Sequence, residues 1–428
     1  MKQKIIFFLF SGVIFFFVGC TKTPHPITPP NDTTKFSLTD FKSAEDCKSC
    51  HPQYYDEWSG SMHAYSSKDP IWNLKNNELQ NSTNGELGTF CFQCHSPIAY
   101  LTGNTKKVFS IDELPPLVQE GVTCDFCHTL RSPHNSTYDV TQYNISPGNK
   151  KYGGIQNPVS NSYHENVYDA SFSSSELCRE CHDLVSNGIE AEITFTEWQR
   201  SQYGAMSVEC QKCHMETYTG KAAINGPIRD NLHRHTFIGV DVAISNLPNR
   251  EEQKRLIDSL LKNSATFSLI VPQTANTTDS TEIITKTIND KTGHNLPSAV
   301  FPSREMWIEI TVWKNNDTIF RSGNLDQNKD LIASNHLTLF SGKFLKNGIE
   351  SSVFDLDSLI NNSLKPFETR ESKYKVKFNS TGTWTIKSRL LIRPFAPKIF
   401  RSLNAHQYLN EIPTFEMANV EKQITITN

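Results

Sequence analysis

The pattern of hydrophobic and polar positions divides the chain into two regions. From residue 265 onwards, apolar and polar side chains alternate with a period of two, which is typical of strands with one buried face. The β-rich segments lie at residues 267–271, 283–288, 306–313, 374–378, 384–392 and 424–426. About seven or eight such strands, separated by turn residues, predict a β-sandwich domain over residues 265–428.

Residues 39–245 show a different pattern, in which apolar runs are short and are interrupted by Gly, Pro, Asn and Ser. The clearest helix in this region is predicted over residues 52–65, because Pro52 suits a first helical turn and aromatic side chains recur after it at helical spacing. A second helix is predicted over residues 250–262, within a connecting segment at 246–264. The fold class is therefore α+β and multidomain, with a mainly α N-terminal domain followed by the β-sandwich.

Five copies of one pentapeptide, Cys-x-x-Cys-His, occur in the N-terminal region. They run from Cys47 to His51, Cys91 to His95, Cys124 to His128, Cys178 to His182 and Cys210 to His214. This pattern is the attachment signature of c-type haem, in which two thiols add across the porphyrin vinyl groups and the histidine coordinates the iron. The covalent residues would be Cys47, Cys50, Cys91, Cys94, Cys124, Cys127, Cys178, Cys181, Cys210 and Cys213. The proximal iron ligands would be His51, His95, His128, His182 and His214.

The count of cysteines argues against the alternatives. The chain has 11 cysteines, and ten of them lie in these pairs. Structural zinc uses such pairs two at a time, so five pairs leave one unmatched, and zinc needs no histidine after each pair. A disulfide scaffold is typical of much shorter chains. We therefore expect five c-type haems, whose porphyrin faces supply much of the buried apolar surface of residues 39–245.

The N-terminus predicts export. Residues 1–19 have the build of a signal peptide, and the ending Phe17-Val18-Gly19-Cys20 resembles a bacterial lipobox with phenylalanine in place of leucine. Cleavage before Cys20 would leave a lipid on its thiol. An uncleaved anchor and an ordinary secretory signal are the alternatives. Residues 20–38 are rich in Pro and Thr and predict a tether, so we expect a lipoprotein on the periplasmic face or at the outer membrane of a bacterial cell.

The sixth position on each iron decides the chemistry. A second imidazole gives a six-coordinate haem suited to electron transfer, whereas a missing ligand leaves an open site. Nine histidines lie outside the motifs, which is enough for five pairs. His63 follows an aromatic stripe on the predicted helix, and His134, six residues after His128, is a further candidate.

Several segments carry a resemblance to a known family. Cys47 to Ala64 and Glu120 to His128 resemble the cytochrome c-554 type multihaem family, here as a pentahaem member with a C-terminal β-domain. The segments 177–183, 197–215, 235–239 and 292–307 resemble larger multihaem relatives. The resemblance implies that the matched histidines are distal haem ligands. These are His63, His164, His235 and His294.

Other residues compete for these roles. His233 competes with His235, because residues so close in sequence cannot easily reach one iron together. Met215 is a weaker candidate ligand, and His336 and His406 are expected to be structural or exposed. The segment Glu57 to Ala64 aligns with Glu197 to Gly204, which suggests an internal repeat in which Tyr203 stands in place of His63.

Two functions from different classes fit these residues. The first is an electron carrier that exchanges electrons with redox partner proteins, such as a membrane quinol oxidase-type donor or other cytochromes, and is bound to a membrane through its N-terminal lipid. The second is a multihaem oxidoreductase acting on a small nitrogen or sulfur compound at a five-coordinate haem, with proton donors such as Arg131, His134, Tyr138 and Tyr203. All five motifs end in histidine, which favours the carrier. A net charge of −3 disfavours nucleic acid as a partner. Binding of a partner protein by the β-domain is a third idea.

Overall fold

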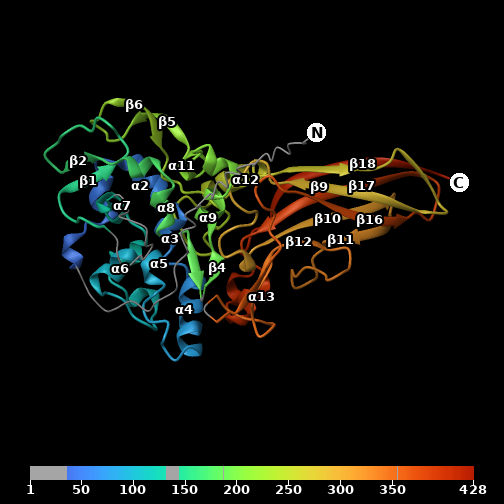
Figure 1. Cartoon of the computed structure of the whole chain (residues 1–428), viewed down its shortest axis with the longest axis horizontal. Coiled ribbons are helices and arrows are strands. Elements are labelled where there is room, and N and C mark those ends of the chain that lie inside the picture. The colour runs from blue at the N-terminus through green and yellow to red at the C-terminus, as the bar shows by residue number, and fades with distance from the viewer. Residues whose placement is uncertain (1–35, 132–143, 187, 354) are drawn as a thin grey trace, which may run out of the picture.

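The computed structural model describes residues 36–131, 144–186, 188–353 and 355–428. It is elongated, with two parts side by side (Figure 1). The N-terminal part comprises the described residues up to 249, and the β-rich part comprises those from 264. The C-terminus lies at the far tip of the β-rich part (Figure 1).

Short helices and three two-stranded sheets make up the N-terminal part. The helices are α1 (Ala44–Lys48), α2 (Pro52–Ser59), α3 (Met62–Tyr65), α4 (Pro70–Ser82), α5 (Phe92–His95), α6 (Pro97–Thr102), α7 (Cys124–Thr129), α8 (Glu176–Arg179), α9 (Thr194–Gln199), α10 (Gln202–Ala205) and α11 (Cys210–His214). The strands are β1 (Lys150–Gly153), β2 (Glu165–Tyr168), β3 (Leu184–Ser186), β4 (Ile189–Glu192), β5 (Thr217–Lys221) and β6 (Ile228–His233). The strands β1 and β2 are parallel, while β3–β4 and β5–β6 are antiparallel pairs.

The helix predicted over residues 52–65 is in fact two helices, α2 and α3. Between them, Ser61 has an extended backbone with φ −95° and ψ 162°, and its hydroxyl accepts a hydrogen bond from the backbone N–H of Ala64. Because this is the geometry of a serine N-cap, a new helix begins at Met62. The prediction of one continuous helix is wrong for that reason.

A 13-residue helix, α12 (Arg250–Lys262), connects the two parts, with the bounds that the sequence predicts. The strands after it are β7 (Thr266–Ile270), β8 (Thr274–Asn276), β9 (Ser280–Ile288), β10 (Glu305–Lys314), β11 (Asp317–Ser322), β12 (Thr338–Phe340), β13 (Gly342–Lys346), β14 (Ile349–Glu350), β15 (Ser358–Asn361), β16 (Thr369–Lys377), β17 (Gly382–Arg393) and β18 (Phe415–Thr427). A further helix, α13 (Pro397–Ser402), lies between β17 and β18.

Most strands of the β-rich part form two main sheets around one core, and β14-β13-β15 form a separate three-stranded sheet. One main sheet has the order β11-β10-β17-β18-β8 with β12 beside β10, and the other has the order β16-β9-β7. Buried side chains of both sheets, such as Ile283, Ile310 and Leu390, belong to one hydrophobic cluster, and Ile257 of α12 joins it. The alternating sequence pattern places these residues inward, since successive side chains of a strand point to opposite faces.

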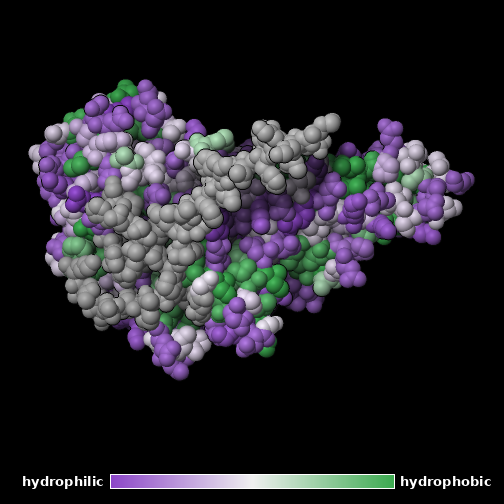
Figure 2. Space-filling model, in the orientation of Figure 1, coloured by the Kyte–Doolittle hydropathy of each residue, from purple (hydrophilic) through white to green (hydrophobic). Residues whose placement is uncertain are grey.

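Direct contacts join the two parts. The guanidinium of Arg304 makes two hydrogen bonds, of 2.6 and 2.8 Å, to the carboxylate of Asp241. Ile71 of α4 shares a hydrophobic cluster with Phe400 of α13. On the face shown in Figure 2, hydrophobic side chains gather on the surface around α13, close to this contact.

Some predictions concern segments that the structure does not describe or describes differently. Residues 1–19, Cys20 and most of the tether lie outside the described residues. The described residues after α12 contain twelve strands, more than predicted, because β8 and β11–β15 are short or lack a clear alternating pattern. Within the described ranges, no helix is long and apolar enough to cross a membrane.

Candidate haem site

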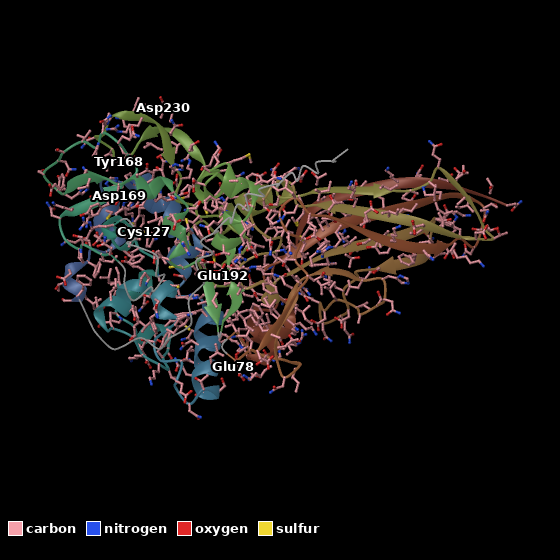
Figure 3. All side chains as sticks on the ribbon, in the orientation of Figure 1. Glu78, Cys127, Tyr168, Asp169, Glu192 and Asp230 are labelled. Atoms are coloured by element: carbon pink, nitrogen blue, oxygen red, sulfur yellow. The ribbon has the colours of Figure 1, made fainter. Side chains whose placement is uncertain are left out.

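All five Cys-x-x-Cys-His motifs open onto one continuous cavity in the N-terminal part. The cavity has a volume of about 3360 Å³, and its lining includes every motif cysteine and every motif histidine. Single ligand pockets usually have volumes of roughly 300–1,000 Å³, so this cavity has room for several large groups. Cys127, which lines it, lies among the helices of this part, and Glu192 lies on the side toward the β-rich part (Figure 3).

Each motif is wound as one helical turn. The backbone N–H of His51 donates to the carbonyl of Cys47 at 2.9 Å, and the same hydrogen bond is made by His95 to Cys91 and by His182 to Cys178. Residues three and four apart lie on one face of a helix, so both thiols and the imidazole point to the same side. The ten motif cysteines form no disulfides. This arrangement suits double attachment of a porphyrin above its axial ligand.

Thiols of different motifs lie in contact. Side-chain hydrogen bonds join Cys47 to Cys124, Cys94 to Cys181 and Cys178 to Cys210. The first contact joins motifs one and three, the second joins two and four, and the third joins four and five. These contacts alone give two groups, motifs one and three and motifs two, four and five. Cys127 of motif three lies within electrostatic reach of Cys181 of motif four, which links the two groups.

Three motif histidines each face a second histidine. The ring centres of His51 and His164 are 6.3 Å apart, with an angle of 26° between the planes. For His128 and His235 the values are 6.3 Å and 25°, and for His214 and His294 they are 6.2 Å and 23°. Two imidazoles that bind one metal ion through bonds of about 2 Å have ring centres roughly 6.4 Å apart. Each pair therefore leaves a gap that fits one iron.

Backbone carbonyls orient these rings. The Nδ1 atoms of His51, His128 and His214 lie 2.6, 2.6 and 2.5 Å from the carbonyl oxygens of Ala222, Tyr152 and Ile238. On the opposite side, the Nδ1 atoms of His235 and His294 lie 3.0 and 2.8 Å from the carbonyls of His233 and Asn295. With Nδ1 as the donor, the lone pair of Nε2 is free to bind metal.

Burial keeps four of these imidazoles neutral. It lowers the pKa of His235 to about 3 and the pKa of His294 to about 4, and it lowers the pKa of His128 and His214 as well. Only the neutral imidazole has a lone pair to offer a metal ion. The electrostatics of the cavity therefore suit iron ligation.

The remaining two motif histidines have different surroundings. His63 lines the cavity within electrostatic reach of His182; burial and then the charge of His182 lower the pKa of His63 to about 3. The indole of Trp72 stacks on the ring of His95, with ring centres 4.9 Å apart and an angle of 11° between the ring planes. Among the described residues, no histidine ring stacks against His95. His134 lies outside the described residues.

The competing candidates are placed as follows. The Nδ1–H of His233 donates to the carbonyl of Met215 at 2.8 Å, and His235 rather than His233 faces His128. His336 and His406 are exposed in the β-rich part. Arg131 lies over the ring of Tyr152, and Tyr203 donates to the carbonyl of Asp290, while Tyr138 is outside the described residues.

Sequence reasoning did not assign roles to Glu57 and Glu197, although both carboxylates contact segments that carry facing histidines. Glu57 accepts a hydrogen bond from the backbone N–H of His235, and Glu197 accepts one from that of Asn295. The signal was present, because both glutamates belong to the internal repeat.

Comparisons with known proteins agree with this geometry. The family model described as cytochrome c554 and c-prime matches residues 46–129. The chain is similar in structure to a penta-haem cytochrome c552 from Thermochromatium tepidum, with 20% identity, a TM-score of 0.65, and coverage of 90% of this chain and 99% of that one. A β-glucosidase from Listeria innocua in complex with glucose has a TM-score of 0.15 at 9% identity, covers 38% of this chain and 16% of its own, and is too dissimilar for comparison. No curated protein matches the chain.

The matched segment holds three of the five motifs, and the shared fold extends over most of the chain. The motifs and the cavity fit covalently bound haem, and the fold is similar to that of the penta-haem cytochrome c552. The chain therefore resembles multihaem c-type cytochromes, which bind haem covalently.

Proposed function

We propose that this protein carries electrons through five covalently bound haems in the envelope of a bacterial cell. The observation that carries the proposal is the set of three histidine pairs that face each other across iron-sized gaps in one cavity. Haem iron with two imidazole ligands supplies reversible one-electron oxidation without a free position for substrate. The penta-haem neighbour in the structural comparison supports the count of five.

The facing rings support three ligand pairs, which we assign as His51 with His164, His128 with His235, and His214 with His294. For His182 we propose His63, which lines the same cavity within its electrostatic reach. Five of these rings, those of His51, His128, His214, His235 and His294, are held by backbone carbonyls, so little rearrangement of the protein should accompany a change of iron charge.

The connected array of attachment thiols supports transfer rather than storage. Contacts between cysteines of motifs one and three, two and four, and four and five, together with the electrostatic reach between Cys127 and Cys181, would bring the five cofactors into one series. An electron entering at one end of the array would then reach the other end without leaving the protein.

A second candidate function is a multihaem oxidoreductase acting on a small nitrogen or sulfur compound. The observation that favours it is the surroundings of His95, where Trp72 stacks on the ring and no described histidine ring faces it. An open position at that motif would make it the reacting centre, while the other four motifs would supply electrons.

Export, lipidation at Cys20 and attachment to a membrane remain part of the proposal, with other redox proteins as partners. They are supported by the sequence of residues 1–20 and by the chemistry of c-type haem, which is attached outside the cytoplasm.

Mass spectrometry and electron paramagnetic resonance test the proposal. The mature polypeptide should carry the added mass of five haems, and a deficit of one would contradict the count. Only low-spin ferric signals are expected of a carrier. A high-spin signal that shifts on addition of nitrite or hydroxylamine would overturn the carrier in favour of the oxidoreductase. The His164→Ala variant, which opens one iron deliberately, calibrates the high-spin signal.

A further inference from the structure

Two segments of the N-terminal part share both sequence and local structure. Glu57 and Trp58 lie in α2, and Glu197 and Trp198 lie in α9. The serine three positions after each tryptophan caps the next helix, α3 or α10, by accepting a hydrogen bond from a backbone N–H three residues on. The repeat seen in the sequence is therefore also a repeat of structure.

Each tryptophan contacts the segment that leads into a later haem motif. The indole N–H of Trp58 donates to the carbonyl of Val122 at 2.8 Å, and that of Trp198 donates to the carbonyl of Val208 at 2.8 Å. Both valines lie two residues before the first cysteine of a motif. The tryptophans thus fix the chain just before Cys124 and just before the corresponding cysteine of the fifth motif.

Further backbone details match between the two copies. The N–H of Val122 donates to the carbonyl of His63 at 3.0 Å, and the N–H of Val208 donates to that of Tyr203 at 2.9 Å. The residues directly before these valines, a glycine and a serine, both have positive φ angles, of 71° and 53°. The second motif lies in the segment between His63 and Val122, which has no counterpart in the other copy.

Each glutamate contacts the segment that carries the histidine facing the motif held by the neighbouring tryptophan. The carboxylate of Glu57 accepts from the backbone N–H of His235 at 2.7 Å and from the guanidinium of Arg234 at 2.7 Å. The side chain of Glu57 is only 12% exposed. His235 is the histidine that faces His128, the last residue of the motif whose entry Trp58 holds.

The second copy repeats this relation. The carboxylate of Glu197 accepts from the backbone N–H of Asn295 at 3.0 Å and from the hydroxyl of Ser298 at 2.6 Å. Asn295 directly follows His294, which faces His214, the last residue of the motif whose entry Trp198 holds.

We infer that the two Glu-Trp pairs are positioning residues, each of which sets both axial ligands of one haem from a single helix. The tryptophan fixes the motif side of that haem, and the glutamate beside it fixes the facing histidine. The glutamate and the tryptophan are adjacent in one helix. That single rigid helix therefore sets the distance between the two imidazoles. This inference rests on the ligand pairs of the proposed function.

The inference predicts which substitutions affect the same haem. In the haem-loaded full-length protein, Glu57→Gln and Trp58→Phe should alter the same low-spin signal in electron paramagnetic resonance. Glu197→Gln and Trp198→Phe should alter a second, different signal. Removing one outer-sphere partner of a metal ligand typically lowers the affinity between ligand and metal 10–100-fold. Because cyanide competes with the weakened histidine, we expect it to bind the affected iron at least about tenfold more tightly than in the unsubstituted protein.

Control variants distinguish a failure of this inference from a failure of the ligand pairs on which it rests. His235→Ala and His294→Ala should each turn one haem high-spin, and Glu190→Ala, which removes an exposed carboxylate paired with Arg200, should leave all signals unchanged. Unchanged spectra in all four glutamate and tryptophan variants, with high-spin haems in the two histidine variants, would overturn the inference alone. Unchanged spectra in the histidine variants would overturn the ligand pairs.

The conservative variants keep the experiment decisive. Glutamine preserves the shape of glutamate, and phenylalanine keeps one aromatic ring in place of the indole, so folding is expected to survive. A merely structural role would perturb several haem signals together in each variant. That outcome, like the absence of any effect, would contradict the assignment of one Glu-Trp pair to one haem.

Discussion

The N-terminal part and the β-rich part fill their interiors in different ways. The β-rich part has one continuous cluster of buried aliphatic and aromatic side chains drawn from both main sheets and from α12. The N-terminal part has several small clusters around a cavity of about 3360 Å³ lined by the haem motifs. The β-rich part has a polypeptide core of its own, whereas the N-terminal part is a shell that the proposed haems would complete.

The difference also appears in the secondary structure. Most helices that carry the motifs have only four to six residues, such as α5, α7 and α8. Isolated helices shorter than about 12 residues are marginal in water. Strands of the β-rich part reach 12 and 13 residues in β17 and β18 and are paired along most of their length. The stability of the N-terminal part must therefore come from what its helices enclose.

The largest difference between the two parts is expected when the chain is produced without haem attachment. Because empty cavities of this size are not stable in proteins, we expect the N-terminal part to lose its ordered structure while the β-rich part keeps its core. Hydrogen exchange followed by mass spectrometry would show slow exchange in β10, β17 and β18 and fast exchange in α5, α7 and α11. Equal protection in both parts would show that the shell stands without cofactors.

Substitution of His294 tests the one facing histidine that the β-rich part supplies. His294→Ala should convert one haem from low to high spin, because the alanine offers no lone pair to the iron opposite His214. Electron paramagnetic resonance of the ferric protein measures the change. The matched control is His336→Ala, which removes an exposed histidine of the same part and should leave the spectrum as it was.

Some features of the fold and site could be predicted from the sequence because the signal was local. The Cys-x-x-Cys-His motifs are contiguous, the helix at 250–262 has a clear apolar stripe, and the longer strands alternate. The break between α2 and α3 was missed, because a serine cap is a short signal within an aromatic stripe that fits one helix. The short strands β3 and β4 lack alternation and were missed as well.

Other features depend on contacts across long stretches of chain. His235 lies more than a hundred residues after His128, and no local pattern determines that these two rings face each other. The resemblance to multihaem relatives pointed to His63, His164, His235 and His294 as a set, but the partner of each came only from the fold. The surroundings of His95 were beyond prediction, because a stacked indole leaves no signature in the spacing of residues.

A substitution within the polypeptide core should affect the β-rich part alone. Leu390 is fully buried, so Leu390→Ala should lower the free energy of unfolding of this part by about 2–5 kcal/mol. Chemical denaturation followed by tryptophan fluorescence measures the loss, with Glu421→Ala on the exposed face of β18 as the control. The haem signals should be unchanged in both variants. A shift of those signals would show that the core of the β-rich part and the cofactor shell are not independent.

The smallest expected effect concerns the ion pair that joins the two parts. Arg304→Ala removes a guanidinium that is 9% exposed and leaves the carboxylate of Asp241 without it, so the protein should lose about 1–3 kcal/mol of stability. The exposed pair of Lys398 and Glu350 is the control, since its loss should cost at most about 1 kcal/mol.

The same variant should also change a haem potential. The positive charge of Arg304 reaches His182, whose pKa is lowered first by burial and then by this guanidinium. Removing a cation, and leaving an unbalanced carboxylate, favours the more positive ferric iron, so the midpoint potential of that haem should fall. A redox titration monitored optically measures the shift. A rise in potential would contradict the placement of Arg304 beside the fourth motif, and an unchanged potential would show that the contact between the two parts is mechanical rather than electrostatic.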